Sequence, residues 1–417
     1  MTSDAQTAES PLAGVKVLDL TSVVVGPVAT QVLAEQGAQV IKIEPPDGDL
    51  LRRLGGQSRS GQLSPKFLQL NRNKRSLAVD LRTQKGQAIV RKLIADSDVM
   101  VTNMRDRALT KLGLTFEDAK ALNPWIVHCS LTGFGRGGAY AERPAYDTII
   151  QGAAGVVGAN HRLTGEARFV PMVLADHVVG LIAVQMILLA LRAAERSGTA
   201  QSVEVPMYES MANFVLQEHM GQKAFRPERG ETGDTRVLDR NSRPAATADG
   251  FICVSANTDK QAFAFFDLIG RPELRNDPRF ESVAARFHNV EAYFGLRNEA
   301  LRQRKTAEWL TLLDKADIPA FPVKSFDDLL EDRHLAEVGL FESLEYPDEG
   351  EVLHMRPPAR IAGASPPDRA HAPMLGEHSR GILSDMGFGD GEVEALIAEG
   401  IVVETCPGKT RQESPDE

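Results

Sequence analysis

Residues 15–43 read VKVLDLTSVVVGPVATQVLAEQGAQVIKI and predict a strand, a helix and a second strand. The β-rich run 15–20 is followed by Pro27, and proline is favoured in the first turn of a helix. We expect the helix to end at Gly37, because glycine readily adopts the left-handed conformation of a helix C-terminus. Residues 39–43 would form the second strand. Such a unit is a right-handed crossover between parallel strands.

The alternation of strand and helix continues to residue 131. Further strands are predicted over residues 76–80, 98–102 and 126–131, with a helix over 84–95 and a short helix after Thr115 and Asp118, which have capping spacing. The pattern predicts an α/β fold with a Rossmann-like, doubly wound parallel sheet. Ligands of such sheets gather at the carboxyl ends of the strands, here segments 21–27, 44–48, 103–107 and 132–138. No GxGxxG follows the first strand, so a standard dinucleotide pyrophosphate site is not expected.

The later sequence predicts a second, smaller α+β domain. Residues 221–250 are polar and rich in Gly, Arg and Asp, which is typical of a linker. A strand at 251–255 and helices near 260–269, 290–302 and 307–315 follow, with Thr306 as an expected N-cap. Residues 350–373 are proline-rich and predict extended chain, before a short helix near 391–399. We expect residues 1–220 and 335–417 to form the large domain, and residues 221–334 to form the small domain with its linkers.

The composition is that of an acidic globular protein. The 417 residues carry a net charge of −10 and are 42% hydrophobic, which disfavours nucleic acid or an anionic membrane as the main partner. The apolar run 178–191 is shorter than a membrane span, and the polar N-terminus lacks the layout of a signal peptide. Three cysteines without a CxxC motif, and histidines without ligand spacing, predict neither disulfides nor a metal site. These features favour a cytoplasmic location.

Residues 178–191 are the most apolar part of the chain, with Gln185 as the only strongly polar side chain. A helix that is apolar on every side is expected to lie inside a core. Asp176 stands where this helix should begin, at a position typical of an N-cap. Backbone N–H groups and the positive end of the helix dipole would keep its carboxylate ionised. A purely structural capping role is the alternative.

Basic side chains and a glycine-rich loop fall near the predicted strand ends. Clustered cations beside a parallel sheet indicate a phosphate-bearing ligand, and ordinary solvated charge is the alternative. The loop 132–138 could bring backbone N–H groups against a ligand or an oxyanion, or it could be a flexible surface loop. The basic side chains are Lys42, Arg72, Lys74, Arg75, Arg82, Arg105, Arg107 and Lys111.

Short motifs recur in a fixed order along nearly the whole chain. They are Leu18-Asp19-Leu20-Thr21, Gly26-Pro27, Gly37-Ala38, Val40-Ile41-Lys42-Ile43-Glu44, Asn71-Arg72-Asn73-Lys74-Arg75-Ser76, Asp80-Leu81, Leu112-Gly113, Ser130-Leu131-Thr132-Gly133-Phe134-Gly135, Tyr146-Asp147, Thr164-Gly165-Glu166, Ala175-Asp176, Thr247-Ala248-Asp249-Gly250 and Leu375-Gly376-Glu377-His378. In this order they resemble the class III CoA-transferases, the CaiB/BaiF family that includes formyl-CoA transferase and carnitine CoA-transferase.

The resemblance implies an enzyme in which Asp176 is the nucleophile. Its carboxylate would attack an acyl-CoA, and the reaction would pass through mixed anhydrides and an aspartyl-CoA thioester before CoA reaches a free carboxylic acid. Tyr146 and Asp147 match positions close to the reacting centre. Coenzyme A would be a substrate, and no permanently bound cofactor is implied.

The resemblance also implies where CoA binds. Residues 22–25 would contact it through their backbone, Arg82 and Lys111 would lie near the nucleotide phosphates, and Asn103 with Met104 would follow the pantetheine arm. The full implied set is Ser22, Val23, Val24, Val25, Val79, Arg82, Asn103, Met104, Arg105 and Lys111. Two departures from the family pattern are Pro45, in place of a basic CoA contact, and Asn241-Ser242-Arg243-Pro244, in place of a glycine-rich lid.

Three other functions compete with CoA transfer. A 2-methylacyl-CoA racemase would share the fold and the aspartate, but in racemases a histidine stands where this chain has Tyr146, so transfer is favoured. A non-catalytic CoA-binding protein would have no use for Asp176. An NAD-dependent dehydrogenase lacks support because the glycine fingerprint is missing.

The acceptor and the assembly are the last expectations. Arg143, Arg168, Arg240 and Arg243 are spare cations that could pair with a second carboxylate, which suggests a dicarboxylate acceptor such as succinate. The resemblance further implies an intertwined homodimer, for which long linkers are suitable.

Overall fold

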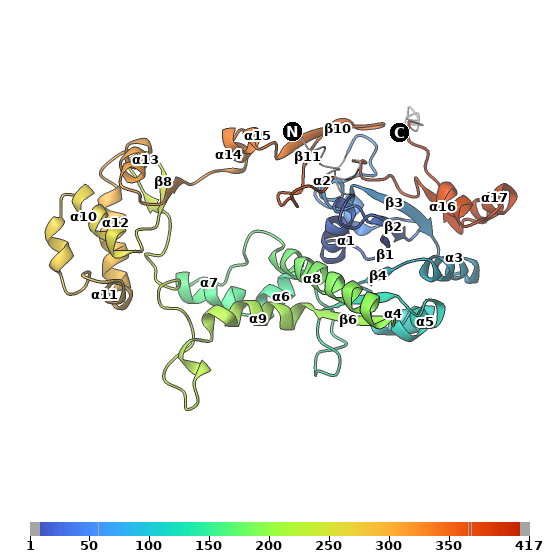
Figure 1. Ribbon diagram of the computed structural model, residues 1–417, viewed down its shortest axis with the longest axis horizontal. Helices are drawn as coiled ribbons and strands as arrows, with labels where there is room; N and C mark the ends of the chain where they lie inside the picture. The colour runs from blue at the N-terminus through green and yellow to red at the C-terminus, as the bar shows by residue number, and fades with distance from the viewer. Residues whose placement is uncertain (1–8, 57, 366, 368, 409–417) are drawn as a thin grey trace, which may run out of the picture. The chain divides into compact units, whose positions relative to one another are not determined.

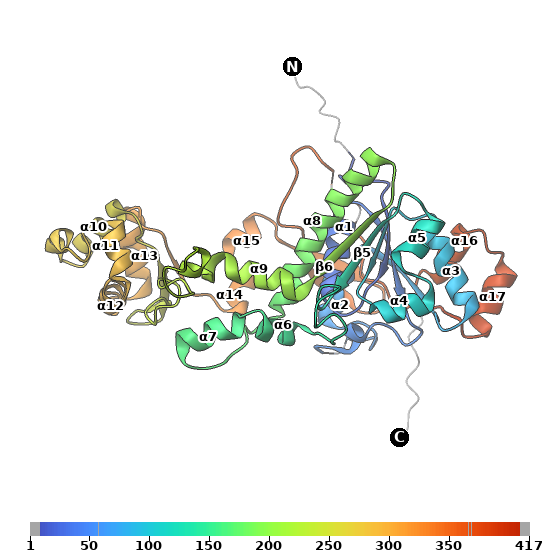
Figure 2. The same cartoon turned by 90° about the horizontal axis from the view of Figure 1, so that it is seen from below.

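The computed structural model describes residues 9–408 except residues 57, 366 and 368 (Figures 1 and 2). Its internal contacts divide the chain into two compact units. The first comprises residues 1–154, 170–213 and 337–417, and the second comprises residues 155–169 and 214–336. Segments 155–169 and 214–220 thus belong to the second unit, although they fall within the large domain proposed from the sequence.

The first unit is built on a seven-stranded sheet with the order β12-β3-β2-β1-β4-β5-β6. All neighbours pair in parallel except β12, which is antiparallel to β3. This is the strand order of a doubly wound sheet, so the predicted α/β fold with a parallel sheet is confirmed. The strands are β1 (Lys16–Leu20), β2 (Gln39–Glu44), β3 (Lys74–Val79), β4 (Val99–Thr102), β5 (Val127–Thr132), β6 (Gln201–Pro206) and β12 (Val402–Val403).

Helices cover both faces of this sheet, as Figure 2 shows. One face carries α3 (Gln84–Ala95), α4 (Asp106–Leu112), α5 (Phe116–Leu122), α16 (Ser379–Asp385) and α17 (Asp390–Ala398). The other face carries α1 (Val25–Glu35) and α8 (Leu174–Ser197), with α2 (Pro65–Asn71), α6 (Asp147–Ala153) and the start of α9 (Met207–His219) in the same unit. Thr115 and Asp118 form the capping box that their spacing predicts.

The α8 helix corrects two predictions. It is buried along one stripe, including Ala175, Val179 and Ala183, whereas Leu181 and Leu189 on its other side are 52% and 64% exposed. It is therefore not enclosed on every side within the first unit. With 24 residues it is longer than the apolar run, and by length and composition alone it could cross a membrane, a criterion that core helices of soluble proteins also meet.

The C-terminal part contains more structure than its proline content predicts. Strands β10 (Phe341–Tyr346) and β11 (Gly350–Met355) form an antiparallel hairpin where extended chain was expected from residue 350. The sequence also gave no signal for α16 or for β12. Both have partners in β3, because Ser379 Oγ in α16 accepts the Ala78 N–H (3.3 Å) and β12 pairs with β3.

The second unit has its own aromatic core, which includes Phe265, Phe266 and Trp309. Its three-stranded sheet consists of β7 (Ala245–Ala246), β8 (Phe251–Val254) and β9 (Ala320–Pro322). Its helices are α7 (Val156–Thr164), α10 (Asp259–Leu268), α11 (Val283–His288), α12 (Val290–Leu301), α13 (Thr306–Lys315), α14 (Phe326–Leu330) and most of α15 (Arg333–Glu337). Thr306 is the first residue of α13 and not its N-cap, and its hydroxyl donates to Asp249 (3.0 Å).

Candidate active site

A cleft of about 880 Å³ opens at the carboxyl ends of β1, β2, β3 and β4. This is the edge at which doubly wound sheets bind ligands, and the volume is suited to a large cofactor-like molecule. Six of the ten residues implied to bind CoA line it: Ser22, Val23, Val79, Arg82, Asn103 and Met104. The other four do not line it. Val24 and Val25 are buried at the start of α1, and Arg105 and Lys111 are exposed near α4.

Two of the expected phosphate-binding lysines are buried in ion pairs instead. Lys42 Nζ lies 2.9 Å from Asp49, and Lys74 Nζ lies 3.1 Å from Asp19, with all four side chains at most 1% exposed. Burial lowers the pKa of Lys74 to about 8, and the lysines hold the pKa of Asp19 well below its usual value against the effect of burial. The sequence prediction failed here because it placed these cations at strand ends but could not detect their buried partners.

Two of the expected phosphate-binding arginines are also paired. Arg72 binds Glu35, and Arg75 binds Asp385 at 2.9 Å. Arg72 and Arg75 lie at the amino-terminal end of β3, whereas the cleft lies at its carboxyl end. Among the cations expected to bind phosphate, only Arg82 lines the cleft within the described chain.

Arg82 presents its guanidinium at the edge of the cleft. Its Nε and Nη2 donate to the two carboxylate oxygens of Asp80, each at 2.8 Å, and its side chain is 85% exposed. The hydrogen bonds with Asp80 raise the pKa of Arg82. A forked pair of this kind fixes the plane of the guanidinium and leaves its other N–H groups for a phosphate.

The glycine-rich loop is not arranged as expected. The backbone N–H of Gly135 donates to Glu209 (2.9 Å), and that of Arg136 donates to Glu204 (2.8 Å). The Arg136 side chain pairs with Asp106. Because carboxylates of the protein already occupy these donors, this loop offers them neither to a ligand nor to an oxyanion.

Asp176 lies in the first turn of α8, but it is not the N-cap. Val173 is the N-cap residue and makes no side-chain capping bond, and Asp176 is the third helical residue. Asp147, the first residue of α6, supplies the missing cap. Its Oδ1 accepts the backbone N–H of Ala175 (2.7 Å) and of Asp176 (3.3 Å). Gln151 donates to the other carboxylate oxygen at 2.7 Å.

This arrangement overturns the expectation that the helix start keeps Asp176 ionised. Burial, followed by the charge of Asp147, raises the pKa of Asp176 to about 7, and Lys66 opposes the shift. The N–H groups that could have stabilised a negative charge on Asp176 already bind Asp147. In the part of the chain that the structure describes, no side chain donates a hydrogen bond to the Asp176 carboxylate. A buried carboxyl with a raised pKa and no such donor is a candidate for a reactive group.

Tyr146 connects this aspartate pair to the cleft. It lines the cleft, is 67% exposed and directly precedes Asp147 in the chain. On the other side, α8 approaches α1 closely at Gly180, where an added Cβ would lie 2.8 Å from the Val25 carbonyl oxygen. The first turn of α8 is therefore held beside the start of α1, which the cleft-lining residues 21–23 directly precede.

The four arginines expected to pair with a second carboxylate are divided between the two units, and the segment in place of the lid belongs to the second unit. Arg143, in the first unit, is exposed and stacks on Tyr140 with 4.6 Å between Cζ and the ring centre. Arg168, Arg240 and Arg243 belong to the second unit, and Arg168 pairs with Glu166. In that unit the Asn241 carbonyl accepts a hydrogen bond from Asn298 (3.0 Å).

The sequence reasoning missed Asp49 and the structural role of Lys42. A signal was present, because Lys42 interrupts the run 40–43, which reads as a strand buried on both faces. A charge in such a strand requires a buried partner. The described residues contain no group of three or more His, Cys, Asp or Glu side chains that could hold a metal ion.

Comparisons with known proteins identify the family. The model of CoA-transferase family III matches residues 12–379. The succinate–glutarate CoA-transferase of Agrobacterium fabrum is 30% identical over 92% of this chain and 98% of its own length. The formyl-CoA:oxalate CoA-transferase of Streptomyces avermitilis is 31% identical over 94% and 99%. The crystal structure of a CaiB/BaiF family protein from Brucella suis superposes with a TM-score of 0.76 at 31% identity, over 91% of this chain and all of that one.

Proposed function

Because this chain belongs to CoA-transferase family III, we propose that it moves CoA from an acyl-CoA to a free carboxylic acid through a thioester on Asp176. The observation that carries the proposal is the Asp176 carboxyl itself. Asp176 is only 9% exposed, and no described group donates a hydrogen bond to its carboxyl. It lies in the helix turn that Asp147 caps, and Tyr146, the residue before Asp147, lines the cleft. A desolvated carboxylate is a stronger nucleophile than a hydrated one.

The proposed chemistry balances in four steps. The Asp176 carboxylate attacks the donor thioester carbonyl, and the carbon–sulfur bond breaks. CoA departs as the thiolate, and a mixed anhydride of Asp176 and the donor acid is formed. The thiolate then attacks the Asp176 carbonyl and releases the donor acid, which leaves aspartyl-CoA. The acceptor carboxylate attacks that thioester and releases the thiolate. Finally the thiolate attacks the acceptor carbonyl of the new anhydride, which forms the product acyl-CoA and restores the Asp176 carboxylate.

A dicarboxylate such as succinate or glutarate is the proposed acceptor class. Its support is the naming of the relatives from Agrobacterium fabrum, mouse and human as succinate–glutarate or succinyl-CoA:glutarate CoA-transferases, at 28–30% identity. A second carboxylate needs a cation, and Arg143 is exposed a few residues before Tyr146. A matrix of acyl-CoA donors against mono- and dicarboxylic acids, measured by mass spectrometry, should give the fastest exchange with four- and five-carbon diacids.

Trapping tests the covalent step. Acyl-CoA followed by hydroxylamine should yield a hydroxamate on Asp176, and Asp176→Ala should lose both the trapped adduct and exchange by at least about a thousandfold. Asp385→Ala, which removes a surface partner of Arg75, is the control and should retain full exchange. Undiminished exchange in Asp176→Ala would refute the mechanism.

A racemase remains the second candidate because it would use the same aspartate. Tyr146 argues against it, since racemases have a histidine at this position and a tyrosine side chain is a poor base for removing a proton from an α-carbon. Incubation with a chiral 2-methylacyl-CoA in D₂O without an acceptor acid should leave the α-carbon free of deuterium. Deuterium at that carbon would establish the racemase.

We also propose a cytoplasmic homodimer. The exposed side of α8, with Leu181, Leu188 and Leu189, is an apolar surface of the kind that a second copy covers. Light scattering during size-exclusion chromatography should give twice the 45.4 kDa chain mass. A stable monomer at micromolar concentration would contradict the dimer.

A further inference from the structure

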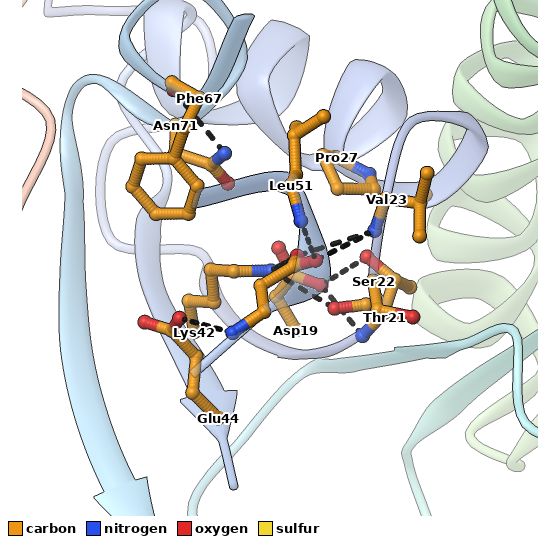
Figure 3. Close-up of polar contacts among 12 residues, drawn as sticks. Asp19, Thr21, Ser22, Val23, Pro27, Lys42, Glu44, Leu51, Phe67 and Asn71 are labelled. Carbon is orange, nitrogen blue, oxygen red and sulfur yellow. Dashed lines mark hydrogen bonds and ion pairs between the residues drawn. The ribbon is translucent and has the colours of Figure 1, made fainter. Parts of the chain in front are cut away.

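The loop between β1 and α1 is held at every backbone polar group from Thr21 N to Val23 N. Figure 3 shows Thr21 and Val23 of this loop close to Asp19 and Lys42. The Thr21 N–H donates to Asp19 (2.9 Å), and its carbonyl accepts from Lys42 Nζ (2.9 Å). The Ser22 N–H donates to Asn103 Oδ1 (3.1 Å), and its carbonyl accepts from Asn103 Nδ2 (2.9 Å). The Val23 N–H donates to both carboxylate oxygens of Asp49, at 3.0 and 3.2 Å. All three loop residues line the cleft.

Val23 has a backbone conformation that valine avoids. Its φ is +67°, in the left-handed region, where a β-branched side chain is strained. Such a conformation persists only when surrounding groups impose it, and it is found preferentially at binding and active sites. Here the imposing contacts are the Asp49 carboxylate on the Val23 N–H and the packing of the Val23 side chain against the cluster that contains Val24 and Leu51.

Lys42 and Asp49 are linked to this loop and to each other. Their ion pair is 2.9 Å long, and the two side chains are 0% and 1% exposed. Asp49 also accepts the Leu51 N–H at 2.9 Å, which fixes its carboxylate plane. Burial alone would lower the pKa of Lys42, but the carboxylates of Asp49, Asp19 and Glu44 raise it overall. A buried charge with saturated hydrogen bonds has one low-energy position, so the pair can act as a rigid support.

We propose that Lys42 and Asp49 are positioning residues for the CoA thioester: Lys42 holds the Thr21 carbonyl and Asp49 holds the strained backbone of Val23, and these residues form part of one wall of the cleft. This inference rests on the proposed function, because the ligand of the cleft is the acyl-CoA of that reaction. A wall formed before binding reduces the conformational entropy that the protein loses when the thioester binds. The positioning pair should therefore affect the binding of CoA more than the chemical step.

Asp49→Asn tests the proposal, because asparagine keeps an acceptor for the Val23 N–H but removes the charge that fixes it against Lys42. We expect the KM for acyl-CoA to rise about tenfold while kcat changes less than about threefold. Glu35→Gln is the matched control, since it disrupts a similarly buried ion pair, with Arg72, that does not contact the loop. It should lower stability without raising KM. Equal KM effects in the two variants would overturn the proposal.

A double-mutant cycle with Val23→Gly identifies the mechanism of the effect. Glycine adopts a positive φ without strain, so the backbone at position 23 would depend less on Asp49 to keep this conformation. The KM penalty of Asp49→Asn should therefore fall to about threefold or less in the Val23→Gly background. Additive penalties would show that Asp49 does not act through Val23. If Asp49→Asn does not fold, Asp49→Glu keeps the charge but displaces the carboxylate by a methylene group, and it should raise KM in the same way.

Calorimetric binding of CoA separates this inference from the proposed function. If the wild-type protein binds no CoA and catalyses no exchange, the function itself fails. If the wild-type protein binds CoA and Asp49→Asn and Asp49→Glu bind it equally well, the function stands and the positioning role falls. If Asp49→Asn and Asp49→Glu bind CoA more weakly while Glu35→Gln binds it normally, the proposed function and the positioning role are both supported.

Discussion

Asp147 Oδ1 accepts the backbone N–H of Asp176 at 3.3 Å, although Asp147 is the first residue of α6 and Asp176 lies in the first turn of α8. Asp147 occupies the anion site at the start of α8, with the N–H of Ala175 as a second donor. Asp176 has a raised pKa beside that carboxylate, and among the described residues no group donates a hydrogen bond to its side chain. The N–H groups at the helix start therefore stabilise the charge of Asp147 and not that of Asp176.

The pH dependence of the reaction should report the ionisation of Asp176. Its pKa is raised to about 7, and only the carboxylate can attack a thioester. We expect kcat/KM for acyl-CoA to rise about tenfold per pH unit below pH 7 and to level off above it, since this parameter reports the free enzyme. Initial rates between pH 5 and 9 measure this. A flat profile across pH 6–8 would contradict a raised pKa.

Two substitutions should move this profile in opposite directions. Asp147→Asn keeps an acceptor for the helix N–H groups but removes the charge that raises the pKa of Asp176. The rising part of the kcat/KM profile should therefore shift to lower pH. Lys66→Gln removes the charge that lowers the pKa of Asp176, so the rising part of the kcat/KM profile should shift to higher pH. The shifts should be of the order of 0.5–1 pH unit. The absence of a shift in both variants would show that burial alone sets this pKa, and shifts in the same direction would contradict the assigned effects of the two charges.

The free energy of unfolding should also depend on pH through the raised pKa of Asp176. The folded-state pKa of Asp176 lies above its unfolded value of 3.8, so the folded protein binds the proton more tightly. The contribution of Asp176 to stability is therefore complete below about pH 4 and is lost as the pH rises through 7. Asp176→Asn should stabilise the protein at pH 8 relative to pH 5 by up to about 3 kcal/mol, because about two pH units of the titration lie between these pH values, at about 1.4 kcal/mol per unit. Urea unfolding at the two pH values measures the difference, and a gain that is equal at both would exclude a raised pKa.

Close packing of α8 on α1 should make Gly180 intolerant of a side chain. An added Cβ would lie 2.8 Å from the Val25 carbonyl oxygen and 2.8 Å from Val28 Cγ1, so α8 would have to move. Gly180→Ala should destabilise the protein by about 1–3 kcal/mol and lower kcat, because the turn with Asp176 moves with the helix. Gly152→Ala in α6 is the control: nothing lies within 4 Å of its added Cβ, and the helix should gain up to about 1 kcal/mol. Thermal unfolding and exchange rates test both variants.

The sequence by itself determined the sheet and the family. Apolar runs of strand length alternate with helix-period segments, and this local pattern predicts a doubly wound α/β fold because each element must bury one face. Pro27 and Gly37 bracket α1, and Thr115 with Asp118 starts α5, because caps are local chemistry. The ordered motifs identified the family and singled out Asp176, Tyr146 and the loop after β1.

Only the tertiary structure decided the electrostatics. Whether Lys42 and Lys74 meet phosphates or carboxylates depends on Asp49 and Asp19, and no local pattern records which side chains face each other inside a sheet. The cap of α8 comes from Asp147, 29 residues before Asp176 in the chain, so the sequence predicted an ionised aspartate where the fold produces one with a pKa near 7. Helix and strand periods follow from neighbours along the chain, whereas a pKa follows from burial and from charges that only folding brings together.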